Sequence, residues 1–302
     1  MIIINKPELL KENGPLLLAC NHPNSFLDSV ILDTLFKNPV WSLARGDAFK
    51  KPFYSKILSS LKMLPVYRTS EGVENLSENY KTFDACLDIF RKKGIITIFS
   101  EGKCINEWHL RPLMKGTARL TIKAWEENIA LKVIPVGINY SSFTRFGKNV
   151  FINFGEIVEC NSIDIKKTDG HRNQAFNNLL QTQLEKLIFE IPFSDREKQT
   201  QLLEKKPTTI KQLLLAIPAL IGWILHAPLY IPVKKFILSR LNDTCHFDSL
   251  ITGMLIILYP FYLLIIISLL IIFTKIWWLL LLIFIFPLSA WAYVQLKQQL
   301  DS

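Results

Sequence analysis

The amino-acid sequence predicts an α/β domain with a mixed sheet flanked by helices, followed by a C-terminal transmembrane helical hairpin. Short β-rich runs alternate with amphipathic stretches over roughly the first 190 residues, which is typical of an α/β sandwich. Two long runs without a charged residue then stand near the C-terminus. Hydrophobic residues make up 50% of the 302 residues, which is too apolar for a wholly soluble protein of this size.

Six short apolar runs are expected to form the sheet. Most are apolar on both faces, as strands covered from both sides should be. They are residues 16–20, 40–44, 64–67, 95–99, 132–138 and 149–154. Apolar residues at helical spacing predict helices over residues 74–93, 115–127 and 172–189. Residues 141–147, between the last two strands, predict a hairpin loop.

The chain is divided into four parts: the α/β domain 1–191, a polar linker 192–212, an apolar segment 213–249, and the hairpin with a short tail 250–302. Residues 250–273 and 276–294 are each uncharged and long enough to cross a hydrocarbon core of about 30 Å. Pro218, Pro228 and Pro232 are unfavourable in a straight spanning helix. They predict that residues 213–232 are interfacial or re-entrant, with a full crossing as the alternative.

The basic residues near the hairpin predict its orientation. Lys234, Lys235 and Arg240 precede it and Lys297 follows it, whereas Lys275 alone stands in its turn. The positive-inside rule therefore places both outer ends in the cytoplasm, with the α/β domain facing the cytoplasm from an inner or plasma membrane. If residues 213–232 crossed the bilayer, the domain and Lys234 would lie on opposite sides.

Charge and missing motifs exclude several classes of function. The net charge of +9 fits an anionic membrane surface or an anionic substrate. We expect no nucleic-acid partner, because the scattered Lys and Arg accompany no nucleic-acid-binding motif. The sequence lacks a dinucleotide fingerprint, a phosphate loop and an HExxH motif, so no cofactor is expected. The five cysteines form no CxxC pair, which predicts reduced cytoplasmic thiols and no metal site.

A histidine follows the first predicted strand. The run Asn-His-Pro-Asn-Ser-Phe-Leu-Asp begins at Asn21, directly after residues 16–20. Strand ends of this kind are where α/β sheets bind ligands. Neutral His22, with an ordinary pKa of about 6.5, can accept a proton from a hydroxyl group. Asp28 can hold the ring and stabilise the imidazolium that forms. The alternative is that His22 only hydrogen-bonds within a turn.

Four stretches in order along the chain resemble a known family. They are NHPNSFLD, ARGDAFKKPF with LPVYR, FSEGKCINEWHLRPLMKGTARL, and VIPVGINY. They are similar to the four successive blocks of the lysophospholipid and glycerol-phosphate acyltransferase superfamily (PlsC-like), over residues 15–155. The resemblance implies transfer of a fatty acyl group from acyl-CoA or acyl carrier protein to the hydroxyl of a glycerophosphate-type acceptor, in phospholipid biosynthesis.

The resemblance also assigns roles to individual residues. It implies that His22 is the general base and that Asp28 orients it. It implies acceptor or phosphate contacts for Arg45, Gly46, Arg68, Glu101 and Gly102, and it places Pro135 in the fourth block. Arg45, Arg68, Arg111 and Lys115 are the candidate phosphate anchors.

Two features depart from the usual family pattern. Five residues rather than four separate His22 from Asp28, which resembles the fungal-type glycerol-3-phosphate acyltransferase branch. This spacing slightly favours glycerol 3-phosphate as acceptor, whereas the general abundance of the activity favours 1-acylglycerol 3-phosphate, so both acceptors stay open. The arginine of the usual EGTR block is missing, and Cys104 stands in its place. Lys103, Arg111 or Lys115 could supply the charge, although lysine does not reproduce the two-pronged contact of arginine with a phosphate.

Other functions stay open at this point. A lyso-aminolipid could be the acceptor in place of a glycerophosphate. A non-catalytic membrane lipid-binding protein on the same fold would be expected to lack His22 or Asp28, and both are present. A thioesterase, which uses water in place of the alcohol, would not need the cluster of basic residues.

Overall fold

The computed structural model describes residues 1–67, 78–165, 167–241 and 244–301. The chain divides into two compact units. The sheet unit consists of residues 3–139 and 151–192, and the helical unit consists of residues 1–2, 140–150 and 193–302. The segment between the last two strands thus belongs to the helical unit, although the sequence suggested only a hairpin loop there.

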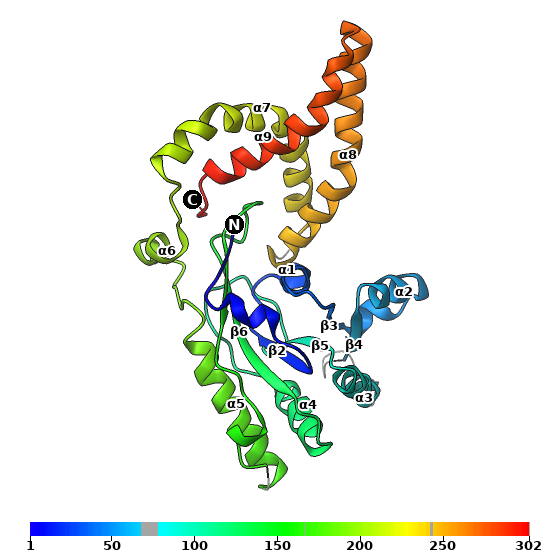
Figure 1. Cartoon of the computed structure of the whole chain (residues 1–302), viewed down its shortest axis with the longest axis vertical. Helices are drawn as coiled ribbons and strands as arrows, with labels where there is room; N and C mark the ends of the chain where they lie inside the picture. Colours follow the sequence, from blue (N-terminus) through cyan, green and yellow to red (C-terminus); the bar gives the residue numbers. More distant parts are fainter. Residues whose placement is uncertain (68–77, 166, 242–243, 302) are drawn as a thin grey trace. The chain divides into compact units, whose positions relative to one another are not determined.

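The described strands form one sheet of seven strands in the order β1-β7-β6-β2-β5-β3-β4 (Figure 1). Their bounds are β1 (Ile2–Ile4), β2 (Leu16–Cys20), β3 (Val40–Arg45), β4 (Met63–Val66), β5 (Ile95–Phe99), β6 (Lys132–Tyr140) and β7 (Val150–Phe154). The six predicted strands are confirmed to within two residues at each end. β1 was not predicted, because three residues are too few to show an alternating pattern.

The central strands run parallel, and this brings the ends of several strands together. β2 pairs in parallel with β5 and β6, and β3 pairs in parallel with β5 and β4. Parallel neighbours need crossover connections, which are mostly helices. These are α1 (Ser25–Leu35), η2 (Gly46–Phe49) with α2 (Pro52–Ser60), α3 (Glu78–Arg91) and α4 (Lys115–Glu126). The residues that follow β2, β3 and β5 therefore lie at the same edge of the sheet.

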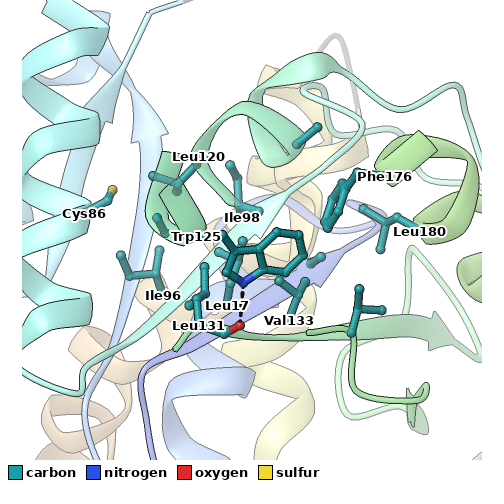
Figure 2. Close-up of a cluster of buried hydrophobic side chains, with 14 of the residues drawn as sticks. Leu17, Cys86, Ile96, Ile98, Leu120, Trp125, Leu131, Val133, Phe176 and Leu180 are labelled. Atoms are coloured by element: carbon teal, nitrogen blue, oxygen red, sulfur yellow. Dashed lines mark hydrogen bonds between the residues drawn. The ribbon is translucent and has the colours of Figure 1, made fainter. Parts of the chain in front are cut away.

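One face of the sheet packs against a helical layer that includes α5 (Asp169–Glu185). Leu17, Ile96 and Val133 of the strands belong to one buried cluster with Trp125 and Phe176 of the helices (Figure 2). The indole N–H of Trp125 donates a 2.9 Å hydrogen bond to the carbonyl of Leu131, so even the polar atom of this large core residue is satisfied. All five residues of β2 are fully buried. The strand that precedes His22 is thus held rigidly within the sheet.

Two of the predicted helices are confirmed with shifted ends, and the third is confirmed in its described part. α4 corresponds to the prediction over 115–127, and α5 begins and ends a few residues before the predicted 172–189. α3 begins at Glu78 within the predicted 74–93, and residues 74–77 lie outside the described residues. α1 and α2 were not predicted.

The helical unit contains α6 (Arg196–Leu203), α7 (Thr209–Arg240), α8 (Phe247–Thr274), η7 (Trp277–Leu281) and α9 (Leu282–Leu296). α6 lies within the predicted polar linker. Three stretches in the described part of the chain are helices long and apolar enough to cross a membrane: 209–240, 247–274 and 277–296.

α7 covers residues 213–232, the stretch that we predicted to be interfacial or re-entrant. It is a continuous helix that contains Pro218, Pro228 and Pro232, and a short η6 (Thr244–His246) follows it. Prolines are tolerated in an apolar helix where a neighbouring helix packs against it. α9 is such a neighbour: a Cβ added to Gly222 of α7 would lie only 2.0 Å from the carbonyl oxygen of Ser289 of α9. The two backbones are in direct contact, as at small-residue crossings in membranes.

Within the helical unit, the loop between β6 and β7 binds both ends of the α8–α9 pair. Lys148 forms an ion pair with Asp248 in the first turn of α8, and the two side chains are 4% and 2% exposed. After α9, the carboxylate of Asp301 accepts hydrogen bonds from Thr144 Oγ1 at 2.6 Å and from the N–H of Phe143 at 3.0 Å. The entry to α8 and the exit from α9 are therefore held at the same loop.

Candidate active site

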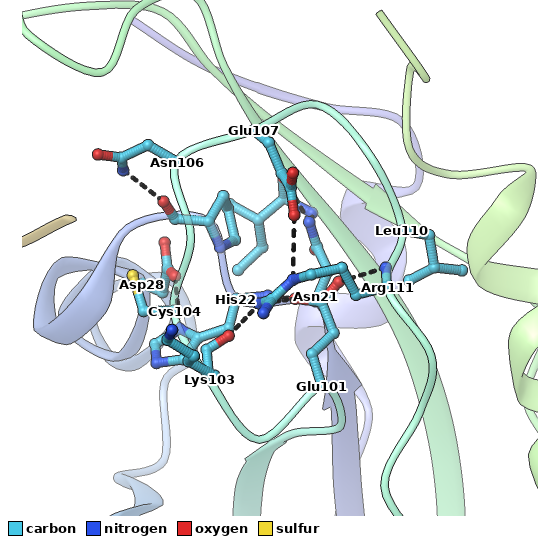
Figure 3. Close-up of polar contacts among 12 residues, drawn as sticks. Asn21, His22, Asp28, Glu101, Lys103, Cys104, Asn106, Glu107, Leu110 and Arg111 are labelled. Carbon is cyan, nitrogen blue, oxygen red and sulfur yellow. Dashed lines mark hydrogen bonds and ion pairs between the residues drawn. The ribbon is translucent and has the colours of Figure 1, made fainter. Parts of the chain in front are cut away.

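His22 and Asp28 are in direct contact. β2 ends at Cys20 and α1 begins at Ser25, so Asp28 lies in the first turn of the helix that follows the histidine. Nδ1 of His22 lies 2.9 Å from Oδ2 of Asp28, and the same oxygen accepts a 2.8 Å hydrogen bond from the N–H of Asn24. The side chain of Asp28 is fully buried, and that of His22 is 15% exposed. Both residues are labelled in Figure 3. With its proton on Nδ1, the ring keeps the lone pair of Nε2 as its basic site.

The imidazole ring is also held from one face. It stacks on the ring of Phe99 with the centroids 3.9 Å apart and the planes 13° from parallel. Phe99 is the last residue of β5 and pairs with Cys20 of β2 in the parallel register. The sequence reasoning missed Phe99, because its place beside His22 depends on the pairing of two strands that are far apart in the chain.

The lengthened loop between His22 and Asp28 is fixed by residues of the third block. Ser25 adopts a φ of +49°, a left-handed conformation that is uncommon for serine. Its N–H donates to Sγ of Cys104 at 3.0 Å, and Nδ2 of Asn106 donates to the carbonyl of Pro23 at 2.7 Å. The five-residue spacing thus still allows the His22–Asp28 contact, and Cys104 supports the loop as a hydrogen-bond acceptor.

Glu101 connects the third block to the first. Its Oε2 accepts a 2.8 Å hydrogen bond from the N–H of His22, and its Oε1 accepts a 2.9 Å bond from the N–H of Arg111. The guanidinium of Arg111 lies 3.1 Å from Oε2, and the side chain of Glu101 is 3% exposed. The carboxylate that resemblance assigned to the acceptor is therefore used to hold the backbone of His22.

The guanidinium of Arg111 is engaged inside the same cluster. It pairs with Glu107 at 3.1 Å and donates to the carbonyl of Lys103, in addition to its contact with Glu101 (Figure 3). Its side chain is 18% exposed. Two carboxylates thus compensate the charge of this candidate phosphate anchor, which supports the loop between Glu101 and α4.

The other predicted residues are placed as follows. Arg45 ends β3, is 54% exposed and pairs with Asp47. Gly46 is buried, and a Cβ there would lie 2.1 Å from the ring of Tyr67. Gly102 has a φ of +69°, which favours glycine, and Lys115 is the exposed first residue of α4. Arg68 lies outside the described residues.

The chemistry of this cluster is that of a base. Within the described ranges, no group of three or more His, Cys, Asp or Glu side chains could hold a metal ion. Other histidines have partners elsewhere: His109 contacts Glu190, His171 contacts Thr168, and His226 contacts the carbonyl of Gly222. A buried carboxylate behind an accessible imidazole is the arrangement that removes a proton from a hydroxyl group.

Comparison with known proteins agrees with this class of site. Residues 1–139 match the family described as Acyltransferase, a match that includes His22, Asp28, Glu101 and Arg111. This part of the chain therefore resembles an acyltransferase domain. No curated protein is significantly similar in sequence.

Among solved structures, the chain is similar to the 1-acyl-sn-glycerophosphate (LPA) acyltransferase PlsC from Thermotoga maritima. The identity is 13%, the TM-score is 0.43, and the similarity covers 62% of this chain and 72% of that chain.

Proposed function

We propose that the protein is an O-acyltransferase that moves a fatty acyl group from a thioester to the hydroxyl of a glycerophosphate-type acceptor in phospholipid biosynthesis. The observation that carries the proposal is the 2.9 Å contact between His22 and the fully buried carboxylate of Asp28. The family match over residues 1–139 supports it. Acyl-CoA or acyl carrier protein enters as co-substrate, and the proposal includes no other cofactor.

In the proposed reaction, Nε2 of His22 takes the proton of the acceptor hydroxyl while the oxygen of that hydroxyl attacks the thioester carbonyl carbon. The tetrahedral intermediate carries the negative charge on the former carbonyl oxygen. The carbon–sulfur bond then breaks, the ester forms, and the leaving thiolate takes the proton from the imidazolium. Asp28 stabilises the imidazolium between the two proton transfers. Base catalysis of this kind contributes about 10²- to 10⁴-fold in rate.

The anionic head group needs cations that are not already neutralised. Arg111 contacts two carboxylates, so we assign it to positioning. Lys103 and Lys115 are exposed residues on either side of Arg111 in the third block. They are the proposed phosphate anchors, together with Arg68. Arg45 pairs with Asp47 and would have to exchange that partner for the phosphate.

The acceptor is proposed in order of preference. The five-residue spacing of the first block favours glycerol 3-phosphate, and 1-acylglycerol 3-phosphate is the second candidate. A lyso-aminolipid is the alternative acceptor. It would not need the phosphate anchors, so its use should be insensitive to the loss of Lys103 or Lys115.

We further propose that the acyltransferase domain faces the cytoplasm. The support lies within the helical unit, where Asp248 in the first turn of α8 and Asp301 after α9 both contact the loop between β6 and β7. α8 and α9 then cross the bilayer as a hairpin, and the basic residues at its two ends lie on the cytoplasmic side. Both halves of α7 also have contacts near the cytoplasmic ends of this hairpin. Lys211 in its first half bonds Gln295 near the end of α9 at 2.6 Å, and Tyr230 in its second half packs against Phe146 of the loop between β6 and β7.

The test uses full-length protein in phospholipid nanodiscs, with labelled acyl-CoA or acyl carrier protein and a panel of acceptors. Free fatty acid and acylated product are followed together. Acylated glycerol 3-phosphate or 1-acylglycerol 3-phosphate is expected, and His22→Ala should abolish it. His171→Ala is the matched control, because His171 is an exposed histidine of α5.

Three outcomes would contradict the proposal. Full activity of His22→Ala would remove the base from the reaction. Release of free fatty acid that is independent of acceptor would identify a thioesterase. Lipid binding without turnover of any thioester would identify a non-catalytic lipid-binding protein.

A further inference from the structure

α2 leaves a group of large apolar side chains exposed on the sheet unit. This short helix has no buried residue. Phe53 is 72% exposed, Tyr54 52%, Ile57 41%, and Leu61, which ends the helix, 52%. We call these four residues the α2 stripe. A contiguous apolar surface of this kind is unusual on a protein that meets only water.

Helical spacing places the α2 stripe on one side of the helix. Phe53, Ile57 and Leu61 are four residues apart, and Tyr54 is three residues before Ile57. Residues three or four apart are neighbours on a helix surface. The stripe is therefore continuous and includes two aromatic rings.

The residues around the α2 stripe are basic. Lys50, Lys51, Lys56 and Lys62 are all exposed, and no acidic residue occurs between Ala48 and Tyr67. Nζ of Lys51 lies 5.9 Å from the ring centroid of Tyr54, and Nζ of Lys62 lies 5.1 Å from that of Trp41. An apolar face with aromatic rings and a lysine border is typical of helices that lie in the interface of an anionic membrane.

The chain topology places the start of α2 near the edge of the sheet that carries His22. η2 begins at the carboxyl end of β3, and α2 follows at Pro52. Because β2, β5 and β3 are parallel, their carboxyl ends share one edge. A bilayer in contact with Phe53 and Tyr54 would therefore lie near the edge of the sheet that carries His22.

We propose that α2 docks on the surface of an anionic bilayer and forms a membrane contact of the sheet unit separate from the apolar helices. Charge complementarity favours this occupant, since the segment carries four lysines and no acid. The chain also contains three helices long and apolar enough to cross a membrane, which tether the sheet unit to a bilayer. The inference does not depend on the proposed reaction.

The first test maps lipid contacts on the wild-type chain. Full-length protein is placed in nanodiscs of phosphatidylcholine with photoactivatable phosphatidylglycerol, and cross-linked peptides are identified by mass spectrometry. Cross-links are expected in residues 50–62 as well as in residues 209–296. Their absence from residues 50–62, with residues 209–296 cross-linked, would overturn the proposal.

The second test separates charge from general damage. Lys50→Gln with Lys56→Gln should lower cross-linking at residues 50–62 by about fivefold for each lysine removed. Lys92→Gln with Lys186→Gln removes the same charge from two exposed positions at the ends of α3 and α5, and it should leave that cross-linking unchanged. Equal loss in both variants would contradict a role for α2.

The third test addresses an acidic protein as the occupant. Acyl carrier protein is added to the nanodiscs, and residues 50–62 are followed by cross-linking to lipid and to protein. The cross-links of residues 50–62 to lipid are expected to persist after the carrier protein is added. Cross-links of residues 50–62 to the carrier protein alone would assign the α2 stripe to a protein partner and overturn the membrane proposal.

Discussion

The N–H of His22 donates a 2.8 Å hydrogen bond to the carboxylate of Glu101, although the two residues are 79 positions apart. Glu101 also accepts from the N–H of Arg111, so it fixes the loops that follow β2 and β5. The glutamate of the third block therefore positions the base.

This contact predicts how Glu101 variants will behave. Glu101→Gln keeps an oxygen that can accept from the N–H of His22, whereas Glu101→Ala removes it. Because a shift of about 1 Å in a catalytic group costs roughly 10²-fold, Glu101→Ala should lower kcat by that order and Glu101→Gln by much less. Steady-state kinetics separate the roles: a raised KM with unchanged kcat would mean that Glu101 binds the acceptor directly.

The contact of Asp28 with His22 predicts that kcat falls when the charge of Asp28 is removed. Asp28→Asn keeps the shape of the side chain but removes the charge that stabilises the imidazolium and selects the tautomer. We expect kcat to fall by roughly 10²- to 10⁴-fold, with the fold unchanged in circular dichroism. A variant with wild-type kcat from pH 6 to 9 would show that Asp28 does not support the base.

The buried pair of Lys148 and Asp248 predicts a test of stability. Removing one partner leaves the other charge buried without compensation, which costs about 3–5 kcal/mol. Lys148→Met should therefore lower the unfolding midpoint of the detergent-solubilised chain strongly. The double variant Lys148→Met with Asp248→Asn should recover much of the loss, and additive losses would argue against coupling of the two charges.

Lys297, which follows α9, predicts a pH effect. Burial, followed by the charges of Arg145, Lys148 and Lys234, lowers the pKa of Lys297 from 10.5 to about 8. Between these values the unfolded chain binds more protons than the folded chain, so stability rises with pH there and the penalty is fully present below pH 8.

Lys297→Gln removes that penalty. Its unfolding midpoint at pH 7 should exceed that of the wild type, and the difference should shrink as the pH rises towards 10. Thermal unfolding, followed by intrinsic fluorescence, measures the midpoint at pH 7 and its change with pH. Lys186→Gln, which removes an exposed lysine, is the control. A lower midpoint for Lys297→Gln at pH 7 would contradict the inferred cost of this charge.

The local sequence pattern was sufficient to predict much of the fold. Strands such as Leu16–Cys20 and Ile95–Phe99 were predictable because apolar runs of five residues carry their own signal. The His22–Asp28 contact was predictable as well, because the two residues are close in sequence and a helix start follows the strand.

What depends on distant pairing was not predictable. The stack on Phe99 and the bond from His22 to Glu101 both require β2 and β5 to be neighbours, which a single sequence does not specify. The ion pairs of Arg111 with Glu101 and Glu107 were not predicted, because they depend on how the loop after β5 folds. The continuous course of α7 through its three prolines was not predicted either, since the packing of α9 against Gly222 is invisible in the pattern.

The backbone contact between Gly222 and Ser289 also constrains how the protein is made. α7 packs more extensively against α9 than against α8, so its main partner is synthesised only after α8. Until residues 282–296 are synthesised, Gly222 lacks the backbone of Ser289 against which it packs. A chain that stops before α9 would therefore leave α7 with only its smaller contact, the one with α8.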